Sequence, residues 1–184
     1  MNVTMTDIKK LREMTGAGLS DCKKALAESE DMDGAVAYLR KKGQAVAAKR
    51  SDREAAEGCV LVKAVDGFGA IIALKCETDF VANNADFVAL TQEILDAAVA
   101  NKCKTLDEVK ALPMGDGTVA DAVTARSGIT GEKMELDGYS YIESDNICTY
   151  NHMNRNGLCA MVALSAPVAD ETVGKNVAMQ IASA

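Results

Sequence analysis

The first apolar positions of the chain follow a helical spacing. Ile8, Leu11 and Met14 recur every third residue, which predicts one face of an amphipathic helix. We expect Thr6 to cap this helix, since its hydroxyl can accept a hydrogen bond from a backbone N–H of the first turn. The helix is expected to end at "TGAG", residues 15–18, because two glycines so close together favour a turn.

Two further short helices are predicted before residue 43. The apolar face of the second comprises Leu19, Cys22, Ala25 and Leu26. The apolar face of the third comprises Ala35, Val36 and Leu39. We expect the third helix to stop at "RKKG", since basic residues followed by glycine are typical of helix C-termini. Three helices in so short a stretch predict a minimal bundle, near the lower size limit for independent stability.

The spacing of apolar positions then changes. "QAVAAKRSDREAAEG" has no strong apolar face and is expected to be a partly helical linker. "GCVLVKAVDGFGAIIALKCET" is rich in Val, Ile and Leu and has Asp66-Gly67 in its middle, which predicts a β-hairpin. "ADFVALTQEILDAAVANK" returns to helical spacing, with Asn84 as its expected cap.

The remaining segments predict a second mixture of helices and strands. "TLDEVKALPMGDGTVADAVTARSG" gives two short helices around a break at proline and glycine. "EKMELDGYSYIESDNICTYNHMNRNGLCAMVALSAP" is strand-like, with "NHMNRNG" as a hairpin tip. A last amphipathic helix is expected from about Asp170. Together these patterns predict an α+β fold, with a helical bundle first and then a core of antiparallel sheet and packed helices.

Composition narrows the kind of core and partner. The chain is 48% hydrophobic but only 4% aromatic, without Trp, so its core must be built from Ala, Val, Leu, Ile and Met. No apolar run approaches 18 residues, and we predict no membrane contact. Residues 1–53 hold 11 Lys and Arg against 8 Asp and Glu, whereas the remainder holds 9 against 19. The acidic remainder argues against direct nucleic-acid binding, and the basic start could meet an acidic protein surface.

The cysteines and the single histidine do not indicate catalysis or metal binding. Six cysteines occur without metal or redox spacing, and His152 is the one histidine, so we predict no metal and no cofactor. Free thiols behind a charged N-terminus unlike a signal peptide predict a cytoplasmic protein. "TGAGLSDCKKAL" lacks the Gly-Lys-Ser/Thr ending of a phosphate loop. An enzyme that uses Cys22 or His152 is the least favoured hypothesis, since no base and orienting acid accompany them.

Two Asp-Phe pairs, Asp79-Phe80 and Asp86-Phe87, lie close together. Phe87 falls on the apolar face of its predicted helix, which indicates a core position. Phe80 lies in the connection "ETDFVAN", where two interpretations stay open. Composition favours a Phe80 that folds back onto the sheet, since exposed phenylalanine is uncommon. The alternative is that Phe80 projects into a partner. Asp79 is expected to cap a single turn there.

Three segments carry a resemblance to a known family. "LREMTGAGLSDCKKAL", residues 11–26, closely resembles the N-terminal signature of the bacterial elongation factor Ts family. "CETDFVA", residues 76–82, resembles that family's second signature, and "YNHMNRNGLCAMVAL", residues 150–164, is similar to a third segment. The three occur in the family's order. The chain departs from the family pattern at "ITGEKMELDGYSYIES", between residues 126 and 144.

The resemblance implies a division into domains. A three-helix head that resembles a ubiquitin-associated domain would cover residues 1–43 and bind a GTPase, and a linker would cover 44–56. The first core subdomain would cover 57–138, and the second would cover 139–184. We expect the second to be incomplete, because the sequence stops where family members continue into a coiled-coil insertion.

The resemblance also implies a function without chemical catalysis. Family members are nucleotide-exchange factors for elongation factor Tu, the GTPase that delivers aminoacyl-tRNA. The resemblance implies that this chain binds the GDP-bound and nucleotide-free forms of that GTPase. The loop with Asp79 and Phe80 would enter beside the magnesium site of that GTPase. The implied contact residues are Arg12, Leu19, Ser20 and Lys23 in the head, Thr78, Asp79, Phe80 and Val81 in the second signature, and His152 and Arg155 in the third segment. The alternative is a ubiquitin-associated-type scaffold that binds partner helices without exchange activity.

Overall fold

The computed structural model describes residues 3–184, which form two compact units. One unit comprises the chain up to Arg53 together with Val123–Lys133, and the other comprises Glu54–Ala122 and Met134–Ala184. The first is helical, and the second combines helices with antiparallel strands. The predicted α+β class is therefore confirmed. The inclusion of residues 123–133 with the N-terminal helices has no counterpart in the sequence-based prediction.

The N-terminal helices are α1 (Met5–Thr15), α2 (Leu19–Ala27) and α3 (Met32–Lys49). Their shared core consists of Ile8, Leu11, Ala17, Cys22, Ala25, Leu26 and Ala35. The three predicted helices are thus confirmed, but Met14 and Leu19 are exposed rather than buried in their predicted faces. Both residues flank the turn between the end of α1 and the start of α2, where the side chains of Met14 and Leu19 reach solvent.

The cap of α1 lies two residues earlier than predicted. The hydroxyl of Thr4 accepts from the backbone N–H of Asp7 at 3.2 Å, and the Asp7 carboxylate accepts from the Thr4 N–H at 3.2 Å. This reciprocal pair is a capping box, which satisfies two backbone donors at once. The prediction of Thr6 as the cap is wrong because Thr6 has no acidic partner three residues on.

The third helix does not stop at "RKKG" as predicted. Gly43 lies inside α3 and is buried, facing Thr124, Ala125 and Gly128 of α7 (Val119–Thr130). A Cβ added at Gly128 would clash with the Cα of Gly43. Gly43 therefore serves close helix packing rather than helix termination, and the predicted end of the head at residue 43 falls within α3.

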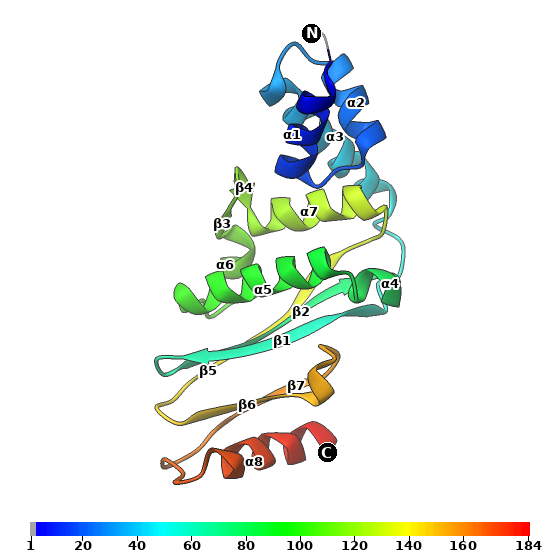
Figure 1. The fold of residues 1–184 in the computed structure, drawn as a ribbon. Helices are drawn as coiled ribbons and strands as arrows, with labels where there is room; N and C mark the ends of the chain where they lie inside the picture. Colours follow the sequence, from blue (N-terminus) through cyan, green and yellow to red (C-terminus); the bar gives the residue numbers. More distant parts are fainter. Residues whose placement is uncertain (1–2) are drawn as a thin grey trace. The chain divides into compact units, whose positions relative to one another are not determined.

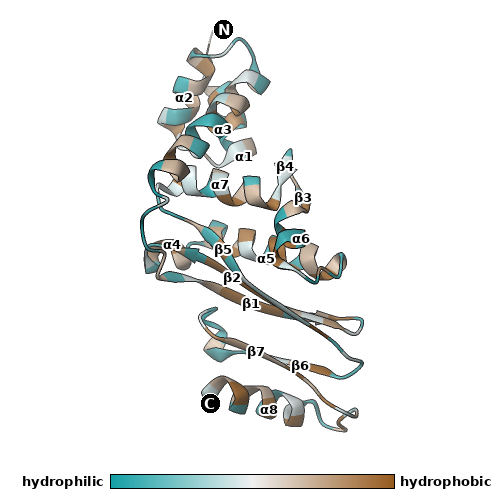
Figure 2. Cartoon of the chain, turned by 180° about the vertical axis from the view of Figure 1, so that it is seen from behind, coloured by the Kyte–Doolittle hydropathy of each residue, from teal (hydrophilic) through white to brown (hydrophobic). Residues whose placement is uncertain are grey.

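The second unit is organised around a three-stranded antiparallel sheet in the order β1-β2-β5, built from β1 (Glu57–Val65), β2 (Phe68–Cys76) and β5 (Glu135–Glu143). The predicted hairpin is confirmed, with Asp66 and Gly67 both at positive φ, as its tight turn requires. β1 and β2 are rich in apolar residues, as the brown colour of both strands shows (Figure 2). The predicted subdomain boundary at residue 138 falls inside β5, which pairs with β2.

Helices and a hairpin cover the two faces of this sheet. The remaining elements are α4 (Asp79–Ala82), α5 (Ala85–Ala100), α6 (Leu106–Ala111), β3 (Pro113–Met114), β4 (Gly117–Thr118), β6 (Ile147–Asn151), η1 (His152–Asn154), β7 (Cys159–Ala163) and α8 (Glu171–Ser183). Within this unit α5 lies along one face of the sheet, the β6–β7 hairpin lies on the other, and α8 packs beyond the hairpin (Figure 1). Asn84 caps α5, as predicted. The last helix begins close to its predicted start, and its cap is Asp170. No helix within residues 3–184 has the length and apolarity to cross a membrane.

Candidate functional site

The connection after β2 folds into the single helical turn α4. The Thr78 hydroxyl accepts from the Val81 N–H at 3.4 Å, and the Thr78 carbonyl accepts from the Ala82 N–H at 3.1 Å. The Cys76 thiol also donates to that carbonyl at 3.2 Å. At the other end, the Asn84 N–H donates to the Val81 carbonyl at 3.0 Å. The turn is thus fixed at both ends, and its cap is Thr78 rather than the predicted Asp79.

Phe80 projects from this fixed turn into solvent. Its side chain is 85% exposed, whereas that of Phe87, on α5, is 0% exposed. Val81 is half-buried and Ala82 is buried, so the turn is anchored by the residues that follow Phe80. The interpretation of Phe80 as a core residue, which composition favoured, is wrong. An exposed aromatic ring on an ordered backbone is suited to fill an apolar pocket of another protein.

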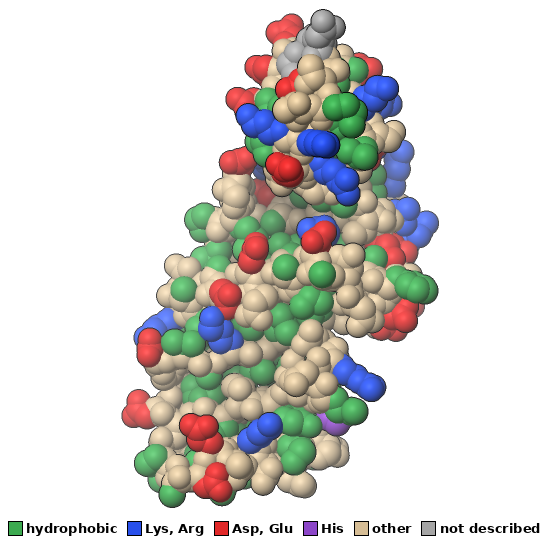
Figure 3. Space-filling model, in the orientation of Figure 1, with side chains coloured by type: hydrophobic (Ala, Val, Ile, Leu, Met, Phe, Trp, Pro, Cys, Tyr) green, Lys and Arg blue, Asp and Glu red, His purple; other side chains and the backbone are tan. Residues whose placement is uncertain are grey.

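The hairpin tip between β6 and β7 carries His152 and Arg155, and both are exposed. The hydroxyl of Tyr150 lies 2.9 Å from Nδ1 of His152. In Figure 3 the single histidine, drawn in purple, lies on the surface beside hydrophobic side chains. His152 is therefore positioned as a surface hydrogen-bonding group, in agreement with the sequence-based interpretation.

The Phe80 turn and the hairpin tip lie at the same end of the second unit. Glu57 at the start of β1 pairs with Cys76 at the end of β2, directly before α4. The carbonyl of Asn156, in the tip, accepts from the N–H of Val60 in β1 at 2.7 Å. Figures 1 and 2 both show α4 and the tip at this end. Two groups of predicted contact residues are thus brought onto one edge of one unit.

The predicted contact residues of the head form a separate group on the helical unit. Arg12, Leu19, Ser20 and Lys23 are all exposed. They surround the turn between α1 and α2, where Gly16 adopts a left-handed conformation and its N–H donates to the Arg12 carbonyl at 2.7 Å. Figure 3 shows Lys and Arg side chains over these helices, with Asp and Glu side chains among them. The surface around this turn combines basic charge with the exposed apolar side chains of Met14 and Leu19, which suits an acidic protein surface with some apolar area.

Three of the six cysteines are placed unfavourably for nucleophilic chemistry. Cys22 is buried in the helical core, and burial raises the pKa of its thiol. Burial likewise raises the pKa of Cys59, and that of Cys159 to about 11. A protonated, buried thiol is a poor nucleophile. Within residues 3–184 no group of three His, Cys, Asp or Glu side chains is placed to hold a metal ion.

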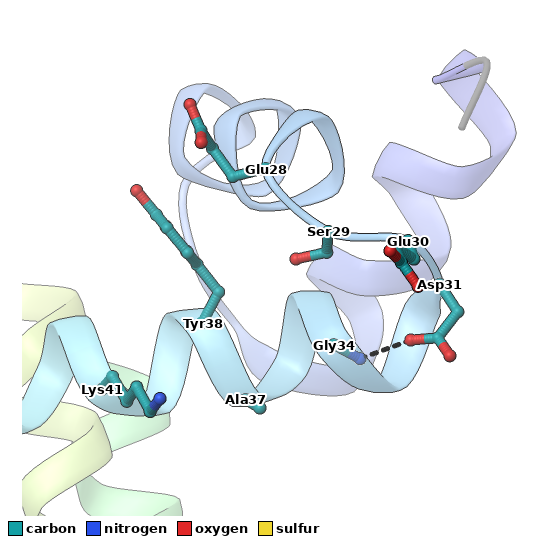
Figure 4. A pocket seen from close by; sticks show the side chains of 8 residues that line it. All are labelled: Glu28, Ser29, Glu30, Asp31, Gly34, Ala37, Tyr38 and Lys41. Carbon is teal, nitrogen blue, oxygen red and sulfur yellow. Dashed lines mark hydrogen bonds between the residues drawn. The ribbon is translucent and has the colours of Figure 1, made fainter.

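A hollow of about 380 Å³ lies between the end of α2 and the start of α3, apart from the predicted contact residues. It is lined by Glu28, Ser29, Glu30, Asp31, Gly34, Ala37, Tyr38 and Lys41. Figure 4 shows Tyr38 and Lys41 on α3 and the Asp31 carboxylate turned back to accept from the Gly34 N–H, at 2.7 Å. That bond is the N-terminal cap of α3. Asp31 therefore serves helix structure.

Comparison with known proteins agrees with the three segments noted above. Residues 77–184 match the model of the family described as "Elongation factor TS". The chain belongs to the elongation factor Ts family. The matched region includes residues 126–144, where the sequence departs from the expected pattern and the structure forms the end of α7 and β5.

Individual relatives of the elongation factor Ts family match over the whole chain. Elongation factor Ts of Bacteroides fragilis is 72% identical over 184 residues, which are 100% of this chain and 56% of that relative. The corresponding protein of Porphyromonas gingivalis is 54% identical over 185 residues, which cover 100% of this chain and 67% of that relative. Elongation factor Ts of Azobacteroides pseudotrichonymphae is 45% identical over 184 residues, which cover 100% of this chain and 67% of that relative. The chain thus spans only about 56% of the first of these relatives.

Sequence reasoning missed two features of the site. It did not single out Met153 and Leu158, which are exposed apolar residues of the hairpin tip. It also missed Thr78 as the cap, although threonine three residues before Val81 is a recognisable capping signal. Met153 offered no such signal, because its left-handed backbone conformation, φ 52°, is visible only in the structure.

Proposed function

We propose that the chain promotes GDP release from elongation factor Tu by inserting the Phe80 turn near the bound magnesium ion. The observation that carries the proposal is the 85% exposure of Phe80 on a turn held by Thr78 and Asn84. A solvated phenylalanine forgoes roughly 1.5–3 kcal/mol of burial. Membership of the elongation factor Ts family supports the choice of partner.

The physical mechanism requires differential binding and no bond breakage. A factor that binds nucleotide-free elongation factor Tu better than the GDP form must weaken GDP binding by the same factor, because the coupling is reciprocal. A rigid aromatic ring inserted between packed elements can displace those that hold magnesium. The Asp79 carboxylate, exposed beside Phe80, would add unfavourable charge near the phosphates. Neither a catalytic residue nor a cofactor is needed.

The other contact residues would supply affinity. Arg12, Leu19, Ser20 and Lys23 form one contact on the head, with Lys23 steering encounter through its charge. His152 and Arg155 form another contact, away from the nucleotide. The partner would be met in its GDP-bound and nucleotide-free states, in the cytoplasm and without direct contact to nucleic acid.

Stopped-flow release of a fluorescent GDP from elongation factor Tu tests this function. The expected result is a release rate that rises with factor concentration and saturates. Excess GDP should in turn speed dissociation of the complex, as reciprocity demands. Binding without any change in the release rate would instead support the scaffold hypothesis, in which the chain binds partner helices but performs no exchange.

A further inference from the structure

The hairpin tip presents an apolar residue in a conformation that its side chain disfavours. Met153 is 61% exposed and has φ 52° and ψ 18°. Asn154 and Asn156 also have positive φ. Asparagine tolerates this region because its short amide bonds locally, whereas methionine does not. Such conformations are unfavourable for residues other than glycine and persist only where surrounding contacts enforce them.

Two asparagines enforce the shape of the tip. The side-chain amide of Asn151 donates to the Asn156 amide oxygen at 2.7 Å, and the Asn156 N–H donates back to the Asn151 amide oxygen at 3.2 Å. The His152 N–H donates to the Leu158 carbonyl at 2.9 Å and closes the loop. The residues between, from His152 to Arg155, are thereby held in one arrangement. We call residues 151–158 the clamped tip.

The clamped tip is also fixed to the sheet that leads to Phe80. Val60 in β1 uses both backbone groups toward this hairpin: its N–H donates to the Asn156 carbonyl at 2.7 Å, and its carbonyl accepts from the Cys159 thiol at 3.3 Å. β1 pairs with β2 along its whole length, and β2 leads directly into α4. The spacing between Met153 and Phe80 is therefore set by hydrogen-bonded backbone, not by a flexible loop.

We propose that Met153 is a further contact residue for elongation factor Tu, and that Asn151 and Asn156 are positioning residues that hold it. The identity of the partner rests on the proposed function, whereas the contact itself rests on the clamped tip. A methionine side chain adapts to irregular apolar surfaces, and the exposed Leu158 enlarges the apolar area. His152 and Arg155 would form the polar rim around it.

The test measures dissociation of the chain from nucleotide-free elongation factor Tu. Met153→Ala is expected to speed dissociation roughly five- to tenfold with little change in the association rate. Met179→Ala is the matched control, because Met179 is a 37% exposed methionine on α8, outside the clamped tip. It should dissociate as the wild type does. Equal dissociation rates for the two variants would overturn the contact.

A double-mutant cycle tests the positioning role. Asn151→Ala should speed dissociation in the wild-type background and add little in the Met153→Ala background, because both changes act through one contact. Asn156→Gly should speed dissociation less than Asn156→Ala does. Glycine keeps the left-handed backbone at this position and, with it, the backbone hydrogen bond to Val60. If Asn151→Ala speeds dissociation by the same factor in the wild-type and the Met153→Ala backgrounds, the positioning role of Asn151 is overturned. Melting temperatures within about 2 °C of the wild type exclude misfolding as the cause.

The same proteins separate this inference from the proposed function. GDP release is measured beside dissociation for every variant. If the wild type binds without speeding GDP release, the exchange proposal fails, while the loss on Met153→Ala still supports the contact. If the wild type speeds release and Met153→Ala dissociates like the wild type, the exchange proposal stands and the contact is overturned. Failure of the wild type to bind elongation factor Tu at all overturns both.

Discussion

The two Asp-Phe pairs have nearly the same local sequence and opposite fates. Asp79-Phe80 opens α4 behind the cap Thr78, and Asp86-Phe87 lies in the first turn of α5 behind the cap Asn84. The Phe80 ring is 85% exposed and the Phe87 ring is 0% exposed. Both turns are capped in the same way, so capping does not decide burial.

Helix length and packing make the difference. α5 has 16 residues and lies against β1 and β2, so its apolar face, which includes Phe87, has a sheet to cover. α4 has four residues and turns the chain between β2 and α5, so it has room to bury only Ala82. A local sequence therefore defines the turn, and the tertiary surroundings define which phenylalanine enters the core.

The largest expected effect is on folding, at Phe87. Phe87→Ala removes a fully buried ring between α5 and the sheet, and should lower the free energy of unfolding by about 3–5 kcal/mol. Urea unfolding followed by circular dichroism measures this. Phe80→Ala serves as the matched control and should unfold as the wild type does. A loss at Phe80 as large as that at Phe87 would contradict the assignment of the two rings.

The next effect is on exchange, at Phe80. Phe80→Ala should cut the acceleration of GDP release from elongation factor Tu by at least roughly tenfold, about 1.4 kcal/mol, because the inserted ring is lost. The melting temperature should stay within about 2 °C of the wild type. Stopped-flow release of fluorescent GDP and thermal melts are run on the same preparation. Normal exchange with reduced stability would identify Phe80 as structural.

Most of the fold, but less of the site, could be predicted from the sequence. Periodicity and turn residues identified the helices, the Asp66-Gly67 hairpin and the Asn84 cap, because these signals are local. The continuation of α3 through Gly43 escaped prediction, since the glycine is explained by Gly128, far along the chain. Composition favoured a buried Phe80, and only the resemblance to the elongation factor Ts family predicted that Phe80 is exposed. The conformation of Met153 depends on Asn151 and Asn156 and on no periodic pattern.

The two caps sharpen the comparison at a smaller scale. The Asn84 side chain accepts from the N–H groups of Asp86 and Phe87, at 2.9 and 3.3 Å. Asn84→Ala should therefore lower the free energy of unfolding by about 1 kcal/mol. Thr78→Ala frees only the four-residue α4, so it should lower exchange more than stability. Unfolding curves and GDP release are measured for both variants. Equal losses of stability and equal losses of exchange in the two variants would contradict this contrast between the caps.

The smallest expected effect separates the two aspartates. Asp79 and Asp86 are both exposed acidic residues in first turns, where negative charge stabilises the helix slightly. Asp79→Ala should slow GDP release only a few-fold, because Phe80 still enters, and Asp86→Ala should leave release unchanged. Combined with Phe80→Ala, the Asp79 substitution should add almost nothing, since both act through one inserted turn. Additive losses in the double variant would instead mean that Asp79 contacts elongation factor Tu independently of Phe80.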